Sequence, residues 1–400
     1  MRTLLLGLLL IAPCAWGAPR QVDDHHWQDV DRIVAIGDLH GDYAGYLGVL
    51  RAAGLVDARG RWTGGTTHLV QTGDIPDRGP DTRRIIGHMG KLAKDAAKKG
   101  GRVHNLMGNH EAMNVHGDLR YVVEGEYAAF ADAGSAARRD RYFAAVMAKM
   151  KQADPAAHAA LPADYRATWN KDHPLGWVEH RAAWDPRWNP KGEMFQWTMQ
   201  ARVAIQLNDL VFVHGGIGPA YCGNSLESMT AMARDALRLE APGKLGILED
   251  EHGPLWYRGL AGVAPVASVG TVDEILKRHG ARHIVIGHTP TGGVVWPRLD
   301  GRVVMIDTGM AAAYGSRIGW LEATKDGLVA SYPGGRMPLP KDDAARASYL
   351  DAVIALQPGN EELAKRRDAL RAGNADPAPD EAGTGALSVP APAPTCDISR

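Results

Sequence analysis

The stretch RIVAIGDLHG, residues 32–41, joins an apolar run to a short polar segment bounded by glycines. The apolar half favours a buried β-strand, and an aspartate and a histidine follow just past its end. An apolar run followed by glycine and potential metal ligands returns in four segments: 73–79 (GDIPDRG), 108–111 (GNHE), 213–216 (VHGG) and 286–289 (IGHT). Ligand sites in open α/β sheets lie beyond the carboxyl ends of strands. We therefore expect these side chains to converge on one edge of a sheet.

Strand and helix patterns alternate from residue 31 onward. Apolar runs predict strands at 32–36, 68–71, 103–107, 202–207, 210–213, 282–286, 302–306, 318–324 and 328–332. Helices are predicted at 43–53, 81–99, 225–239, 272–279, 341–356 and 361–371. The β-α-β-α-β order of the first elements predicts an α/β fold, with a mostly parallel sheet and helices on its faces.

Residues 112–199 interrupt this alternation. Their first part is rich in alanine and predicts helix around 126–151, and their second part holds five tryptophans: Trp169, Trp177, Trp184, Trp188 and Trp197. We interpret the segment as an inserted helical cap over the site with a substantial apolar surface. A helical subdomain that packs its own small core is a compatible interpretation.

The two ends of the chain have compositions of their own. Residues 1–18 begin with Met-Arg-Thr, continue as a short apolar core and finish with small residues, the layout of a secretory signal peptide. This predicts a periplasmic or secreted protein. Residues 19–30 suggest a polar, solvated lead-in to a main domain at 31–335. A helical extension is predicted at 336–373, and the Ala- and Pro-rich tail, 374–400, is predicted to be disordered.

The charge balance limits the partners. Among 400 residues, 45 Lys and Arg nearly balance 46 Asp and Glu, so no basic field favours nucleic acid. Beyond the signal peptide no segment is long and apolar enough for stable membrane insertion. The oligomeric state is not readable. Two cysteines would remain after export, Cys222 and Cys396. An oxidising compartment permits a disulfide between them, and the alternative is a buried Cys222 with a free Cys396.

The candidate ligands define a chemistry before any family is considered. Carboxylate, amide and imidazole donors suit divalent ions such as Mn, Fe, Zn or Co. The absence of thiols from the set argues against a structural zinc site of the cysteine type. Two ions joined by one carboxylate activate a water molecule and neutralise charge on a phosphoryl group. Arg78 and Arg258 would then clamp the remaining phosphate oxygens.

The ordered segments GDLHG, GDIPDRG, GNHE, VHGG and GHT resemble those of the calcineurin-like metallophosphoesterases, and within them the phosphoprotein phosphatase (PPP) family. Residues 117–121 (GDLRY) and 256–259 (WYRG) resemble the bacterial-type, Shewanella-like protein phosphatase branch. The resemblance covers roughly residues 31–325. It implies a metallophosphoesterase-type β-sandwich flanked by helices.

Carried over residue by residue, the resemblance implies two divalent metal ions, with manganese expected. The implied metal ligands are Asp38, His40, Asp74, Asn109, His214 and His288. Asp74 would bridge the two ions. His110 would act as the general acid, with Asp77 orienting its imidazole, and Arg78 and Arg258 would bind the phosphate.

Some of these residues have simpler interpretations. Asp77 and Arg78 would instead form a salt bridge that only stabilises a turn, and Arg258 rests on a short motif. Glu111 is expected behind the ligands, and residues 307–309 are expected to support the site from behind. The histidines of the insert, including His180, are not assigned.

The leading hypothesis is a phosphomonoesterase acting on phosphoprotein or phosphopeptide side chains through a metal-bridging hydroxide, without a phosphoenzyme. The branch resemblance favours phosphotyrosine and leaves phosphoserine and phosphothreonine open. The alternative enzyme is a small-molecule phosphohydrolase acting on nucleotides, dinucleoside polyphosphates or phosphodiesters. A third hypothesis, a non-catalytic binding module, is disfavoured because the ligand set is complete.

Overall fold

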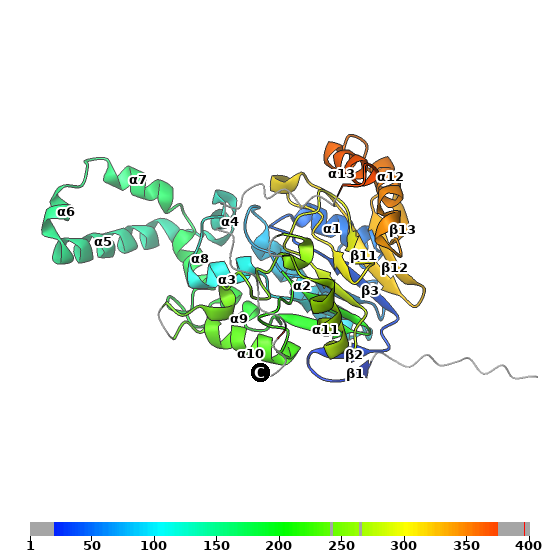
Figure 1. Ribbon diagram of the computed structural model, residues 1–400. Helices are drawn as coiled ribbons and strands as arrows, with labels where there is room; N and C mark the ends of the chain where they lie inside the picture. Colours follow the sequence, from blue (N-terminus) through cyan, green and yellow to red (C-terminus); the bar gives the residue numbers. More distant parts are fainter. Residues whose placement is uncertain (1–19, 241–242, 264–265, 375–395, 397–400) are drawn as a thin grey trace, which may run out of the picture.

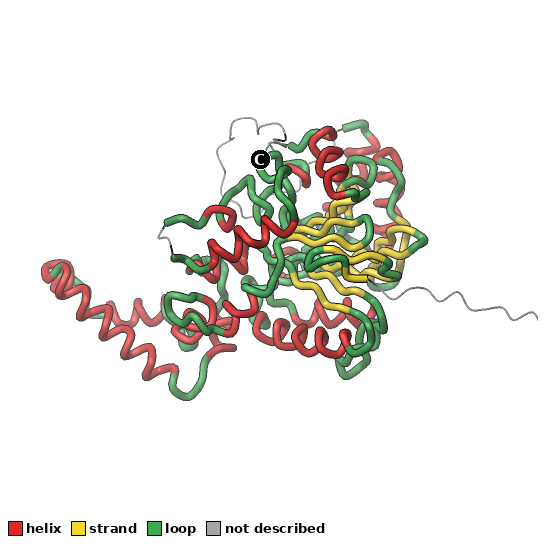
Figure 2. Tube along the Cα trace, turned by 90° about the horizontal axis from the view of Figure 1, so that it is seen from below, coloured by secondary structure: helices red, strands yellow, loops and turns green. Residues whose placement is uncertain are grey.

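The structure, a computed structural model, describes residues 20–240, 243–263, 266–374 and 396. Two β-sheets share one continuous hydrophobic core, which contains strand residues of both, and helices flank the strands (Figures 1 and 2). The predicted signal peptide and nearly all of the predicted disordered tail lie outside the described residues. Within the described ranges we find no helix whose length and apolarity suit it to crossing a membrane.

The first sheet has the strand order β1-β2-β6-β7-β8-β10-β9. Its strands are β1 (Arg20–Gln21), β2 (His26–Gln28), β6 (Ala204–Leu207), β7 (Leu210–Val213), β8 (His283–Ile286), β9 (Trp296–Arg298) and β10 (Val303–Met305). The second sheet has the order β13-β12-β11-β3-β4-β5. Its strands are β3 (Arg32–Ile36), β4 (His68–Gln71), β5 (Arg102–Asn105), β11 (Trp320–Thr324), β12 (Gly327–Tyr332) and β13 (Gly335–Pro338).

The predicted α/β sandwich is confirmed, with sheets that are mixed. The strands that lead into the glycine-bounded ligand segments pair in parallel: β3 with β4, β4 with β5, and β7 with β8. Short turns instead connect β6 to β7, β11 to β12 and β12 to β13, and these pairs are antiparallel. A two-residue connection permits only antiparallel pairing, whereas a parallel pair needs a long crossover. Two-residue turns therefore account for these antiparallel pairs, and long connections allow the parallel ones.

The helices follow the predicted periodicity closely. The body carries α1 (Tyr43–Ala52), α2 (Thr82–Ala97), α3 (Asn109–His116), α10 (Leu226–Leu237), α11 (Val269–His279), α12 (Arg346–Leu356) and α13 (Glu361–Arg371). The apolar face of α2 is buried, and Gly100 and Gly101 follow its end. Short 3₁₀ turns are η1 (Gly246–Leu248), η2 (Gly259–Ala261), η3 (Ala312–Tyr314) and η4 (Asp343–Ala345).

The insert divides into a part against the body and a projecting arm. Its helices are α4 (Glu124–Phe130), α5 (Ser135–Ala153), α6 (Pro155–Ala159), α7 (Tyr165–Asp172), α8 (Trp177–Trp184) and α9 (Glu193–Thr198). Figure 1 shows α5, α6 and α7 reaching away from the sheets; we call them the arm. Tyr142 on α5 packs against Trp177 and Trp188, with ring centroids 5.5 and 5.0 Å away. These tryptophans thus pack within the insert, as the subdomain interpretation expects, and the arm itself does not lie over the site.

Segments near both ends of the chain are tied to the body. The predicted solvated lead-in at 19–30 is wrong for its second half, because β2 pairs in parallel with β6 and Trp27 is buried in the core. Burial of Trp27 holds this segment against the core, although the charged residues around it had predicted exposure. The open question of the cysteines is answered by a disulfide between Cys222 and Cys396.

Candidate metal centre

Five of the six predicted metal ligands lie within three residues after a strand or open a helix at one end of the sandwich. Asp38 follows β3, Asp74 follows β4, His214 follows β7, His288 follows β8, and Asn109 begins α3 after β5. His40, the sixth, lies two residues beyond Asp38, and all six side chains are buried. The convergence expected from the strand ends is present.

Asp74 lies at the centre of this cluster. Its carboxylate belongs to two groups of potential ligand atoms, one with His40 and His110 and the other with His214 and His288. Its Oδ2 is 3.3 Å from His214 Nε2 and 3.9 Å from His40 Nε2. A carboxylate shared by two groups is the arrangement that a bridging ligand requires.

The histidines are oriented by hydrogen bonds that leave one ring nitrogen facing the cluster. His40 Nδ1 donates to the Pro76 carbonyl at 3.0 Å, and His214 Nδ1 donates to the Thr72 carbonyl at 2.9 Å. The other nitrogen of each ring, Nε2, points toward Asp74. Metal-binding histidines characteristically donate their second N–H to a carbonyl or carboxylate, which fixes the tautomer.

Buried carboxyl groups accumulate around the cluster. Burial, with the nearby Asp307 and Asp74, raises the pKa of Asp38 well above its usual range. Burial raises the pKa of Glu111 to about 7 and that of Asp307 to about 6. Burial opposes ionisation of Asp74 as well, but His214 and His110 outweigh it and lower its pKa. So many buried carboxyls need cations, and the oxygen and imidazole donors fit two divalent ions.

Supporting groups hold the bridging segment in place. Glu111 accepts hydrogen bonds from the backbone N–H groups of Asp74, Ile75 and Gly108 at 2.8–2.9 Å. A Cβ at Gly108 would lie 2.1 Å from Asp74 Oδ1, so only glycine permits this approach. Five candidate site residues have positive φ values: His40 (43°), Asp74 (59°), Asp77 (73°), Arg78 (64°) and His288 (64°). Such conformations cost about 1–3 kcal/mol each unless the surroundings enforce them.

His110 and Asp77 form a buried pair beside the cluster. His110 Nδ1 lies 2.5 Å from Asp77 Oδ2, and His110 Nε2 lies 3.8 Å from Asp74 Oδ2. Burial alone would lower the pKa of His110, but Asp74 and Asp77 outweigh it and raise the pKa. Among the described residues Asp77 makes no ion pair with Arg78, so the turn-only interpretation of this pair has no support. An imidazole held by a carboxylate at one nitrogen presents the other as a proton donor.

The two candidate phosphate-binding arginines lie at the rim of the cluster. The guanidinium of Arg78 lies between two rings, 4.4 Å from the Tyr121 centroid and 4.9 Å from the Tyr314 centroid. Arg258 donates through Nη1 to the His288 carbonyl and to Thr289 Oγ1, each at 3.0 Å. Both guanidinium groups are thereby held next to the predicted metal-ligand residues.

Comparisons with known proteins agree with this geometry. The sequence profile of the calcineurin-like phosphoesterases matches residues 31–292. The chain belongs to this family. The phosphoesterase chain is 30% identical over 288 residues to Shewanella-like protein phosphatase 2 of Arabidopsis thaliana, covering 70% of this chain and 72% of that one. It is 32% identical over 289 residues to an uncharacterized protein of Schizosaccharomyces pombe, covering 70% and 74%.

A solved structure extends the likeness to the fold. The cold-active protein-tyrosine phosphatase of a psychrophilic Shewanella species matches with a TM-score of 0.59 and 27% identity, over 79% of this chain and 82% of that chain. The relatives confirm the Shewanella-like resemblance read from residues 117–121 and 256–259. This phosphoesterase is therefore a metal-dependent phosphatase. The roles of its individual site residues remain predictions that the geometry accommodates.

Sequence reasoning missed several neighbours of the predicted residues. Asn114 donates to Asp77 Oδ1 at 2.9 Å, and its place four residues after His110 on α3 was a usable signal. Tyr121 lies within the segment already singled out at 117–121. Trp256 contributes its carbonyl, which accepts from His288 Nε2 at 3.1 Å. Glu126 and His180 of the insert, both fully buried, gave no pattern that would have marked them.

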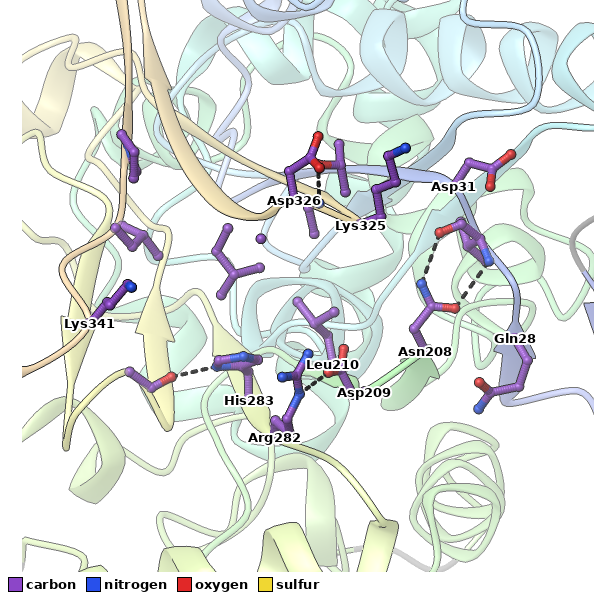
Figure 3. A pocket seen from close by; sticks show the side chains of 18 of the residues that line it. Gln28, Asp31, Asn208, Asp209, Leu210, Arg282, His283, Lys325, Asp326 and Lys341 are labelled. Carbon is purple, nitrogen blue, oxygen red and sulfur yellow. Dashed lines mark hydrogen bonds and ion pairs between the residues drawn. The ribbon is translucent and has the colours of Figure 1, made fainter. Parts of the chain in front are cut away.

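A second hollow of the phosphoesterase lies at the opposite end of the sandwich (Figure 3). It is lined by the starts of β7 and β8 and by the β11–β12 turn, far along the strands from the metal ligands. Several of its polar groups are engaged with neighbouring protein groups: Arg282 pairs with Asp209, Asn208 donates to the Val30 carbonyl, and His283 bonds to the Gly301 carbonyl.

Proposed function

We propose that this phosphatase hydrolyses phosphomonoesters on protein side chains. The observation that carries the proposal is the His110–Asp77 pair set 3.8 Å from the carboxylate shared by both ligand groups. The names of the relatives, a Shewanella-like protein phosphatase and a protein-tyrosine phosphatase, support a protein substrate.

The predicted site residues have three roles: two bind the phosphate, one orients the proton donor, and one donates the proton. Arg78 and Arg258 bind the non-bridging phosphoryl oxygens and hold the ester in line for attack by water. Asp77 keeps His110 Nδ1 protonated and fixes the ring, and His110 gives its Nε2 proton to the departing oxygen. The released product is then a neutral alcohol or phenol.

The six predicted ligands would hold two divalent ions, with Asp74 between them. When bound, the ions supply Lewis acidity that neutralises the phosphoryl oxygens and lowers the pKa of a water molecule. We propose manganese as the working metal, because oxygen and imidazole donors without thiols suit it. Removing metal with a chelator and restoring Mn, Fe, Zn, Co or Mg singly, with metal content measured each time, tests this choice.

A substrate panel tests the proposed function directly. Phosphotyrosine, phosphoserine and phosphothreonine peptides are compared with nucleotides, dinucleoside polyphosphates and phosphodiesters on the purified protein. We expect the highest kcat/KM on phosphopeptides, with phosphotyrosine first. A nucleotide or diester with a clearly higher kcat/KM would replace protein substrates by the small-molecule alternative.

We also propose that residues 1–18 direct the protein to export and are then removed. The apolar start of the chain and the Cys222–Cys396 disulfide support an oxidising destination such as the periplasm. The test is cell fractionation with N-terminal sequencing of the mature protein. An uncleaved chain in the cytoplasm, with both thiols free, would contradict the proposal.

A further inference from the structure

The loop that carries Asp77 is held from behind by the insert. Asp77 is fully buried and has a φ of 73°, a conformation that residues other than glycine seldom adopt. Its backbone N–H donates to Glu126 Oε2 at 3.1 Å. A buried amide without an acceptor costs about 1–3 kcal/mol. The bond from Glu126 therefore helps keep the loop in this conformation.

Three contacts together fix the Asp77 carboxylate. Glu126 acts on the loop backbone, whereas Asn114 donates to Oδ1 at 2.9 Å and His110 bonds to Oδ2 at 2.5 Å. The two side-chain contacts set the rotation of the carboxylate only if the backbone beneath it stays in place. Glu126 lies in the first turn of α4, so that backbone support comes from the insert.

Glu126 has a buried neighbour of its own. His180, on α8, places Nε2 3.8 Å from Glu126 Oε1 and packs edge-on against Tyr127 and Phe130. Neither ring nitrogen of His180 has a hydrogen-bond partner among the described residues. Burial lowers the pKa of His180 to about 3, and burial together with Asp77 raises the pKa of Glu126 well above its usual range. His180 is therefore uncharged at neutral pH, and Glu126 can accept the Asp77 amide proton whether or not its carboxyl group is protonated.

We propose that Glu126 is a positioning residue of this phosphatase: by accepting the Asp77 amide, it fixes the loop so that Asp77 aims His110 at the leaving oxygen. Through α4, the insert thereby helps to orient the general acid His110 without itself contacting the substrate. The inference rests on the proposed function, because only a reaction that needs a general acid reveals it.

The test is a matched pair of substitutions, Glu126→Gln and Glu126→Met. Glutamine keeps an uncharged carbonyl acceptor for the Asp77 amide, whereas methionine keeps the length of the side chain and removes the acceptor. The kcat and KM of each are measured on aryl phosphates from 2,4-dinitrophenyl, whose leaving group needs no proton, to phenyl, whose leaving group does. Circular dichroism and metal content are recorded for every variant.

We expect Glu126→Met to lower kcat on phenyl phosphate about tenfold, part of the 10²–10⁴-fold contribution of a general acid. The loss on dinitrophenyl phosphate should be small, KM should stay similar, and Glu126→Gln should behave like the wild type. An equal loss on both substrates, no loss at all, or a Glu126→Gln variant as impaired as Glu126→Met would overturn the proposal. If Glu126→Met does not fold, Glu126→Asp replaces it. Its side chain is one methylene shorter, so the acceptor no longer reaches the Asp77 amide, and the same losses of kcat on the two substrates are expected.

The same aryl phosphates are also measured with the wild type and with His110→Asn. These measurements distinguish a failure of the Glu126 positioning role from a failure of the proposed function. If the wild type hydrolyses no aryl phosphate, or if His110→Asn shows no dependence on the leaving group, the proposed function itself has failed. If both behave as expected and only the Glu126 variants do not, the failure belongs to the positioning role.

Discussion

The two ends of the sandwich are built from similar residues and differ in what those residues face. At the metal end, carboxylates and imidazoles are buried and point toward one another around Asp74. At the opposite end, the charged groups of the hollow include an exposed ion pair, Arg282 with Asp209, and they do not gather around one buried carboxylate. Ionisable residues become a site when the fold buries them together and directs them at one point.

Two buried histidines show the same contrast. His110 lies beside Asp74 and Asp77, and its pKa is raised. His68, at the start of β4, lies with its Nδ1 3.1 Å from His104 Nε2, and burial lowers its pKa to about 4. A buried histidine beside carboxylates is thus a candidate proton donor, whereas a buried histidine beside another histidine stays neutral.

Replacing Asp74 should have the largest effect. We expect Asp74→Asn to lose metal and to show no detectable phosphatase activity, because the carboxylate common to both ligand groups loses its charge. Metal analysis and an aryl phosphate assay measure this, with circular dichroism as the control for folding. Wild-type metal content in the variant would contradict the central place given to Asp74.

Replacing His110, the predicted proton donor, should have the second-largest effect. His110→Asn should lower kcat by about 10²–10⁴-fold, the usual contribution of a general acid, while metal content stays near that of the wild type. If metal is lost as well, His110 is a ligand, as its place in one of the two groups permits.

At the opposite end, the buried histidine predicts a dependence of stability on pH. The unfolded chain takes up a proton on His68 near pH 6.5, whereas the folded chain resists until about pH 4. Stability is therefore greatest above pH 6.5 and falls toward pH 4, by at most about 1.4 kcal/mol per pH unit for one histidine. His68→Gln should make the decline shallower in urea titrations at several pH values, and an unchanged slope would assign the decline to other groups.

The smallest effect should come from the exposed pair in the hollow. Arg282→Ala should change the free energy of unfolding by no more than about 1 kcal/mol, the range for surface ion pairs, and should leave kcat and KM unaltered. A large loss of activity would show that this end contributes to function after all.

Much of the metal end could be predicted because its residues lie next to strand ends. The apolar runs ending at residues 36, 71 and 213 fixed where Asp38, Asp74 and His214 emerge, and the observed strands end at those same positions. The positions of residues just after strand ends can be predicted from the sequence, because the sheet determines where those strand ends meet.

The remainder depended on contacts between distant segments. Glu126 meets Asp77 across 49 residues, and the burial of Trp27 depends on a pairing between β2 and β6 that no local pattern encodes. The insert was interpreted as a cap because five tryptophans suggested a substantial apolar surface, and two of them, Trp177 and Trp188, pack against Tyr142 and against each other. Apolar content predicts that a surface is buried without saying which partner buries it.

The left-handed backbone at Asp74, Asp77 and Arg78 changes how this site should be dissected. Alanine at these positions would remove a functional group and at the same time oppose the local chain conformation, so a damaged variant would report both losses together. Glycine relieves the conformational penalty while deleting the same functional group. Scanning these three positions with glycine and alanine side by side would separate the chemical contribution of each side chain from the contribution of its turn.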